Sequence, residues 1–511
     1  MSKGIAVLIA AALAAFGVMR GTWAVGGSDS SCYALMAKAF AAGEVQPFSA
    51  IGVEAPWPDG STTTAPGGFI PSPVRAGAAS PICAPGFAVL MAPFAALFGQ
   101  DAIFWLTPIA GAGLVLSSFA IARRLAGGAA GVTAALLVAS SPIVLFQVVQ
   151  PMNDVTTAAL WMWVFALLAT DDAPNSLRRS RLAGFLAGLA ILVRPNLAPL
   201  GIVAIALVLA REETRGRKNN SAGAVVISAI FGIALMLSLN QALYGRVFGS
   251  GYGDISSLFS PSHVADNARN FSAALFATQH AVPILGLLAP LVFIGGRRTV
   301  AAVLLAAAAL TIGIYLLYRP YPEWWYLRFL MPALVIMLIL ASAVAVELAS
   351  RARMRGLIPL LAVLLAILGT REAGARDVFA LQGLEGRYRD TAAVVSERLP
   401  ANAVLITAWQ SGSVRFHAAR EIVMWDSLDP QWLDRAVEWL DQRGRKPFLL
   451  LERREEVEFR QRFRGRATIG GLDWPPRFVV NRQVRIFDPS DRVRYLAGES
   501  YATENISSSR R

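Results

Sequence analysis

Long apolar blocks separated by short basic clusters fill the first 370 residues, and they constrain the fold more than any other feature. The first block, Ile5 to Val25, is long enough to cross a bilayer at about 1.5 Å per residue. The chain is 55% hydrophobic and 16% charged, with a mean hydropathy of +0.50, whereas soluble chains carry about a quarter charged residues. The sequence therefore predicts a polytopic α-helical membrane protein.

The blocks predict about eleven transmembrane helices. Basic clusters flank them, so the positive-inside rule places the N-terminus in the cytoplasm and the C-terminus outside a plasma (inner) membrane. Residues 182–210 are interrupted by Arg194-Pro195-Asn196 and are interpreted as a hairpin of two short helices. A single kinked helix there is the alternative, and it would invert everything that follows. The other predicted spans are 5–25, 102–122, 127–149, 155–170, 222–243, 280–296, 299–318, 328–350 and 356–370.

Two domains follow from this pattern, a membrane domain over residues 1–370 and a soluble extracytoplasmic domain over residues 371–511. A long first loop, 26–101, is rich in Gly, Pro, Ser and Thr and is expected to contain juxtamembrane helices. The soluble part alternates helical and β-like stretches, which predicts a small α/β domain with a mainly parallel sheet. Its strands are expected at 403–407, 447–451 and 479–487, and its helices at 388–399, 431–442 and 452–463. A structural or regulatory lid is favoured over a second catalytic centre.

The formal net charge of +13 does not indicate a nucleic-acid partner. Basic residues between apolar blocks are typical of cytoplasmic loops, and an Arg-rich tail can contact anionic lipid headgroups. The bilayer is thus the expected partner. Cys32 and Cys83 are the only cysteines and share the first loop, where an oxidising compartment would allow a disulfide. Two unpaired small apolar side chains remain the alternative, and no Cys/His cluster has zinc-ligand spacing.

Acidic residues are scarce in the first 170 positions, so each one outside the cytoplasm is a candidate for chemistry. Asp29 lies just beyond the first span and Asp154 at the outer end of the third, while Glu54 and Asp59 share the first loop with Asp29. Two carboxylates at a membrane surface can act as a general base and stabilise an oxocarbenium ion. The alternative for Asp29 and for Asp154 is a helix N-cap.

A phosphate leaving group needs cationic donors, and three arginines are candidates. Arg194 lies within apolar sequence, where a charge is costly and usually faces a cavity or a partner; a structural ion pair is its alternative role. Arg319 and Arg328 frame a segment with Glu323 and several aromatic residues, which form either a sugar platform or an interfacial belt. Tyr252 lies in another glycine-rich outer loop and is a further candidate for substrate binding.

These segments resemble the GT-C glycosyltransferases, in particular the bacterial protein-mannosyltransferase and aminoarabinose-transferase-like group. The resemblance covers roughly residues 5–370 and rests on order and spacing: the Asp29 loop directly after the first helix, the Met152-Asn153-Asp154 turn, and the stretches Leu189 to Pro195 and Trp324 to Pro332. Two departures are the absence of an acidic pair at Asp29 and the presence of Asn153 before Asp154.

The resemblance implies an inverting transferase that takes a sugar from a polyprenyl-phosphate donor on the outer face, with Asp29 as base and Asp154 as the second acidic residue. Some relatives use a divalent metal and others do not, so metal dependence stays open. The acceptor is a glycan, a lipid or a protein. The rival interpretations are a multi-pass transporter, for which no matching second half is found, and a non-catalytic component of cell-envelope polysaccharide assembly.

Overall fold

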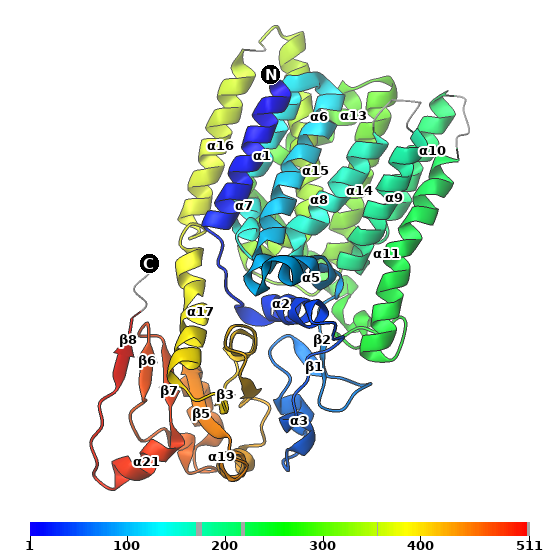
Figure 1. The fold of residues 1–511 in the computed structure, drawn as a ribbon. Coiled ribbons are helices and arrows are strands. Elements are labelled where there is room, and N and C mark those ends of the chain that lie inside the picture. Colours follow the sequence, from blue (N-terminus) through cyan, green and yellow to red (C-terminus); the bar gives the residue numbers. More distant parts are fainter. Residues whose placement is uncertain (170–175, 216–219, 355, 508–511) are drawn as a thin grey trace.

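The computed structural model describes residues 1–169, 176–215, 220–354 and 356–507. The described chain forms a helical bundle with a smaller α/β unit at one end, and the N-terminus lies at the opposite end of the bundle (Figure 1). The bundle contains α1 (Ser2–Met19), α6 (Leu106–Ala139), α7 (Pro142–Val148), α8 (Asn153–Leu168), α9 (Ser176–Val193), α10 (Leu200–Arg215), α11 (Ser221–Tyr244), α12 (Val264–Gln279), α13 (Ala289–Val292), α14 (Gly295–Leu316), α15 (Met331–Arg351) and α16 (Leu357–Ala375).

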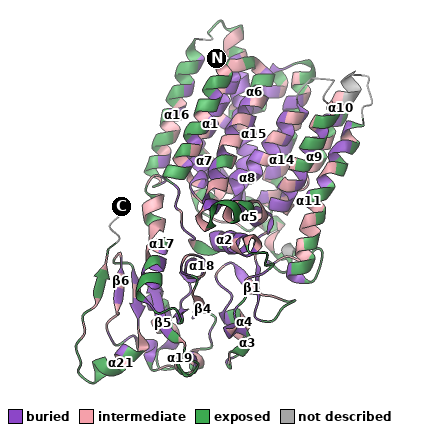
Figure 2. Cartoon of the chain, viewed as in Figure 1, coloured by how far each residue is buried: buried purple, intermediate pink, exposed green. Residues whose placement is uncertain are grey.

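The bundle has the composition of a multi-pass membrane domain. Within the described residues, six helices are long and apolar enough to span a bilayer, and a bent pair would make seven. Helix α15 is its centre and is buried nearly all round, whereas α16 and α11 expose apolar side chains on the outside (Figure 2). This distribution fits a lipid-facing surface around a packed core. The larger number of eleven spans stays a prediction.

One predicted span, residues 280–296, differs from the structure in an informative way. Residues 280–296 form a 3₁₀ segment, η6 (Val282–Leu288), and one turn of α13, bent by 105° from α12. Pro283 and Gly286 explain the break, because both residues disfavour an α-helix, and Gly286 packs against the backbone of α15. Helix α12 itself lies where the sequence suggested an outer loop.

Residues 182–210 form a hairpin. Helix α9 ends beside Asp154 at the start of α8, since Arg194 pairs with that carboxylate. Helix α10 ends beside the other end of α8, where Arg211 donates to the carbonyl of Leu168. Helices α9 and α10 therefore run in opposite directions, and Arg194 lies in the turn between them.

The first loop contains α2 (Gly27–Ala41), α3 (Ile51–Glu54), α4 (Gly60–Thr63), β1 (Phe69–Pro71), β2 (Ala79–Pro81) and α5 (Gly86–Phe98). Helices α2 and α5 lie across the end of the bundle, between it and the α/β unit (Figure 1). Cys32 and Cys83 form a disulfide that joins α2 to the segment between β2 and α5. Ile51 and Trp57 instead belong to the hydrophobic core of the α/β unit.

The α/β unit is built on a mixed six-stranded sheet in the order β4-β3-β5-β7-β6-β8. Strand β3 pairs in parallel with β4 and β5, and β6 with β8, but β7 is antiparallel to both neighbours. Strands β3, β5 and the β6–β7 pair lie where the sequence predicts strands, whereas the three-residue strands β4 and β8 were not predicted. The elements are α17 (Leu381–Arg398), β3 (Ala403–Ile406), β4 (Glu421–Val423), α19 (Leu433–Gln442), β5 (Lys446–Glu452), α20 (Glu455–Phe463), β6 (Phe478–Val480), β7 (Val484–Phe487), α21 (Pro489–Leu496) and β8 (Glu504–Ile506).

Candidate active site

Asp29 lies in the first turn of α2, at the bundle end that carries the α/β unit. The N-cap residue of α2 is Gly26, so Asp29 is not the helix cap. Its carboxylate accepts a hydrogen bond from Nη2 of Arg328 at 2.8 Å, and 40% of its side chain is exposed. The partly positive helix N-terminus favours a negative charge at this position. Asp29 is therefore a charged group that a substrate can reach.

Asp154 occupies the equivalent place on α8 but in a different environment. It follows the first helical residue, and Met152 is the N-cap, so Asp154 is not a cap either. Its carboxylate is paired with Arg194, and the two side chains are only 2% and 11% exposed. A buried charge of this kind persists only with a close counter-ion. Asp154 and Arg194 thus form a closed ion pair in the wall of the site.

The two Asp–Arg pairs meet at one aromatic ring. The guanidinium carbons of Arg194 and Arg328 each lie 5.3 Å from the ring centroid of Phe329. Nη1 of Arg328 also lies 3.9 Å from the sulfur of Met152, two residues before Asp154. The structure thus places Asp29, Asp154, Arg194 and Arg328 in a single cluster, although they come from four separate segments of the chain.

Two tyrosines outside the spanning helices report the same electrostatic environment. Burial raises the pKa of Tyr33, and the negative charge of Asp29 raises it further. Tyr252 and Asp154 add smaller increases, and the positive charge of Arg194 partly offsets them. Partial burial and then Asp29 raise the pKa of Tyr252 to about 12, although its side chain keeps some solvent exposure. Both phenols therefore stay protonated at neutral pH, in the field of the Asp29 carboxylate.

Aromatic side chains line the cluster on the side of η7 (Trp324–Leu330). The rings of Tyr321 and Tyr326 stack at 4.2 Å, and Tyr315 stacks on Phe329 at 5.2 Å. The amide of Asn196 donates to the hydroxyl of Tyr315 at 2.8 Å, which ties the Arg194 turn to α14. This arrangement fixes both arginines on ring faces, where cation–π contacts hold them.

Four candidates remain to be placed: Arg319, Glu323, Glu54 and Asp59. Arg319 and Glu323 are exposed on the segment before η7. Glu54 lies 3.8 Å from Arg445 of the α/β unit, and Asp59 starts the short α4 beside it. Helices α3 and α4 lie on the far side of α2 from the bundle (Figure 2), and Glu54 contributes to the contact between the first loop and the α/β unit.

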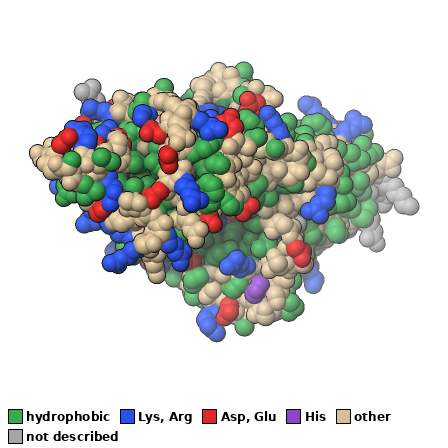
Figure 3. Space-filling model, turned by 90° about the horizontal axis from the view of Figure 1, so that it is seen from below, with side chains coloured by type: hydrophobic (Ala, Val, Ile, Leu, Met, Phe, Trp, Pro, Cys, Tyr) green, Lys and Arg blue, Asp and Glu red, His purple; other side chains and the backbone are tan. Residues whose placement is uncertain are grey.

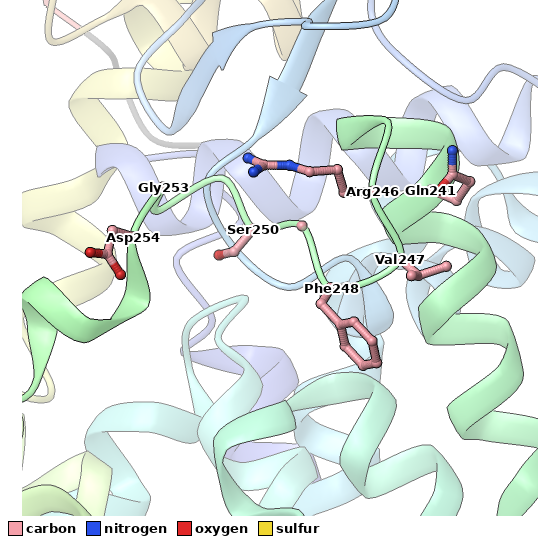
Figure 4. A pocket seen from close by; sticks show the side chains of 8 residues that line it. Gln241, Arg246, Val247, Phe248, Ser250, Gly253 and Asp254 are labelled. Atoms are coloured by element: carbon pink, nitrogen blue, oxygen red, sulfur yellow. The ribbon is translucent and has the colours of Figure 1, made fainter.

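A cavity of about 720 Å³ opens at the loop after α11, on the side of the segment that carries Tyr252. Arg246 and Phe248 project from this loop in different directions (Figure 4). The cavity is lined by Gln241, Arg246, Val247, Phe248, Gly249, Ser250, Gly253 and Asp254. Viewed from the end with the α/β unit, the molecular surface is hollowed near its centre, with apolar side chains in the hollow and charged ones at its rim (Figure 3).

In the described parts of the chain, no group of three or more His, Cys, Asp or Glu side chains comes together that could hold a metal ion.

Sequence reasoning missed Tyr33 and Phe329 as site residues. Tyr33 could have been found, because it follows Asp29 by four residues and so shares its helix face. Phe329 carried no signal, since it is one apolar residue within an apolar segment.

Comparison with known proteins identifies relatives of the fold. Residues 81–239 match the family model described as dolichyl-phosphate-mannose-protein mannosyltransferase. The structure resembles that of ArnT from Cupriavidus metallidurans bound to undecaprenyl phosphate, with a TM-score of 0.60, 15% sequence identity and coverage of 90% of this chain and 95% of ArnT. A comparison with curated protein sequences found no match.

Two further structures share the architecture. Arabinofuranosyltransferase AftD from Mycobacteria matches with a TM-score of 0.51 and 15% identity, over 88% of this chain and 37% of AftD. The oligosaccharyltransferase from Archaeoglobus fulgidus, in complex with Zn and sulfate, matches with a TM-score of 0.50 and 12% identity, over 90% of this chain and 69% of that protein. The chain is a multi-pass membrane protein with the fold of the GT-C glycosyltransferases, which confirms the predicted resemblance.

Proposed function

We propose that this protein is an inverting glycosyltransferase that moves a sugar from a polyprenyl-phosphate donor to an acceptor outside the cytoplasm. The observation that carries the proposal is the asymmetric cluster: an exposed carboxylate, Asp29, beside two buried arginines at one end of a GT-C fold. The match to ArnT bound to undecaprenyl phosphate supports a lipid-phosphate donor.

In the proposed reaction Asp29 accepts the proton of an acceptor hydroxyl or amine as that group attacks the anomeric carbon. The new bond forms on the face opposite the leaving group, so the configuration inverts. The bond between the anomeric carbon and the phosphate oxygen breaks, and its electron pair stays on the phosphate. The guanidinium groups of Arg328 and Arg194 stabilise that negative charge, and polyprenyl phosphate is released.

The distribution of charge supports the proposed orientation in the membrane. Arg124 donates to the carbonyl of Ala169, Arg297 to that of Leu125, and Arg351 to that of Val292. These three arginines lie at the end of the bundle away from Asp29. By the positive-inside rule that end faces the cytoplasm, and the α/β unit faces outward.

The test separates binding from chemistry. Purified protein in detergent should be stabilised against heat by undecaprenyl phosphate, and Asp29→Asn should keep this stabilisation. The same variant should lose transfer by about a thousandfold or more, measured as release of undecaprenyl phosphate from a panel of undecaprenyl-phosphate sugars, because the isosteric amide cannot accept the proton. Wild-type turnover by Asp29→Asn would refute the assigned base, and a wild type that neither binds nor turns over the lipid would refute the function.

A further inference from the structure

The disulfide between Cys32 and Cys83 lies next to the active-site cluster. Cys32 follows Asp29 by three residues on α2, so the two side chains occupy neighbouring positions on the helix. Cys32 is also adjacent in sequence to Tyr33. The two cysteines are 1% and 4% exposed, and their Cα atoms are 6.3 Å apart. The bond therefore anchors the first turns of α2 at a point one helical turn from the carboxylate.

The start of α2 has no side-chain cap that would fix its backbone. The helix begins at Gly26-Gly27, its N-cap has no side-chain hydrogen bond, and Gly27 has a φ of +78°. Glycine gives this junction backbone freedom that other residues lack. Asp29 follows directly, so its position depends on the contacts that hold this end of α2. Gly26 packs against Tyr388 of α17, Arg328 donates to the carboxylate, and the disulfide anchors the next turn of the helix.

The other half of the disulfide holds the loop that carries Tyr252. Ser80 in β2 donates to the carbonyl of Leu243 at 2.7 Å, and the hydroxyl of Tyr244 donates to the carbonyl of Pro81 at 2.8 Å. Gly251 packs so tightly here that a Cβ would lie 2.1 Å from the oxygen of Pro81. The segment immediately before Cys83 is thus in direct backbone contact with the residue immediately before Tyr252.

These contacts link α2 to the loop after α11 through the segment that ends at Cys83. Asp29 on α2 and Tyr252 on that loop are close enough for the charge of Asp29 to raise the pKa of Tyr252. The disulfide is the covalent part of the frame that connects the two sides. Non-covalent contacts remain without it, since Gly68 packs against the backbone of Ser28, and the bundle has a hydrophobic core of its own.

We propose that Cys32–Cys83 is a positioning element of the transferase site, which sets the distance between Asp29 and the Tyr252 loop rather than holding the protein folded. This inference rests on the proposed function for its kinetic part. Its structural part does not, because the geometry of α2 and the loop can be measured without a substrate. A misplacement of about 1 Å is enough to lower a rate about a hundredfold.

The experiment uses full-length protein with Cys32→Ala/Cys83→Ala, which keeps both buried positions apolar. We expect kcat for release of undecaprenyl phosphate from its sugar conjugate to fall about 10- to 100-fold, with KM for that donor within about threefold of wild type. Reducing the wild type with a phosphine should reproduce the loss, and reoxidation should restore the rate. The double variant is the matched control, because these are the only cysteines in the chain and the phosphine should leave its rate unchanged.

Hydrogen–deuterium exchange gives the readout that does not depend on turnover. Exchange should rise in peptides covering residues 26–33 and 245–254 of the double variant and stay unchanged in α15. An unchanged kcat, or exchange that rises throughout the bundle together with a loss of folded protein, would overturn the positioning role. If the wild type turns over no donor, the proposed function fails by itself, and equal exchange in both proteins would then reject the positioning element independently.

Discussion

The buried pair between Arg194 and Asp154 makes a quantitative prediction. Replacing Arg194 with Ala leaves a carboxylate that is only 2% exposed without its counter-ion. Removing one partner of such a pair costs about 3–5 kcal/mol, because the remaining charge stays desolvated. At about 1.4 kcal/mol for each factor of ten, the unfolding equilibrium should shift by a factor of about a hundred to several thousand.

The structure offers a matched control of the same chemistry. Arg389 and Asp101 form an Arg–Asp pair at 3.0 Å whose side chains are 48% and 44% exposed. Exposed pairs contribute at most about 1 kcal/mol, so Arg389→Ala should lower the unfolding free energy only slightly. A second control removes both buried charges: Arg194→Met with Asp154→Asn should regain most of the stability while transfer stays lost.

The assay is unfolding of the purified protein in mixed micelles, titrated with SDS and followed by tryptophan fluorescence. Transfer is measured on the same samples. If Arg194→Ala costs no more stability than Arg389→Ala, Asp154 is not the desolvated anion that its burial indicates. If the neutral double variant is as unstable as Arg194→Ala, packing of the Arg194 side chain rather than charge explains the loss.

Two other predictions concern the contact between the α/β unit and α2. Burial, with the positive charges of Arg389 and Lys38, lowers the pKa of His417 to about 4, while an unfolded His titrates near about 6.5. The unfolded chain therefore binds the proton first as the pH falls, so the free energy of unfolding should be lower at pH 4.5 than at pH 7. His417→Phe should reduce this difference, and an unaltered pH dependence would contradict the assignment. At Gly412 a Cβ would lie 2.2 Å from the hydroxyl of Ser31 on α2, so Gly412→Ala should lower transfer activity. Adding Ser31→Gly should restore part of that activity. A double variant no more active than Gly412→Ala would contradict the predicted steric conflict.

Local sequence was enough to select several of the residues that the structure groups together. Asp29 and Asp154 were selected because carboxylates are scarce near the ends of apolar blocks, and Arg194 because a charge interrupts an apolar stretch. The pairing of Arg328 with Asp29 could not be read in the same way, since 299 residues separate them. Only the packing of η7 against α7, α12, α14 and α15 places Arg328 beside α2. Hydropathy placed most helices, yet it could not show that Pro283 and Gly286 would convert a predicted span into a bent 3₁₀ segment.

The first loop shows a different limit. Glu54 and Asp59 share that loop with Asp29, and proximity in sequence suggested a shared site. The structure instead uses Ile51 and Trp57 to pack this part of the loop into the core of the α/β unit, and Glu54 comes near Arg445 there. The decisive information is the partner surface, which residues nearly 400 positions later contribute, such as Arg445 for Glu54. No local pattern contains it.

The two Asp–Arg pairs are similar in chemistry but not in what they can do, and burial decides the difference. Asp154 is closed off by Arg194 on a wall that solvent barely reaches, so it can tune the field of the site but cannot readily meet an acceptor. Asp29 has the same charge and a similar partner, yet two-fifths of its side chain is open. A base must exchange its proton with solvent after each turnover. Of the two carboxylates, only Asp29 has that route, and this is the physical reason for proposing Asp29 as the general base.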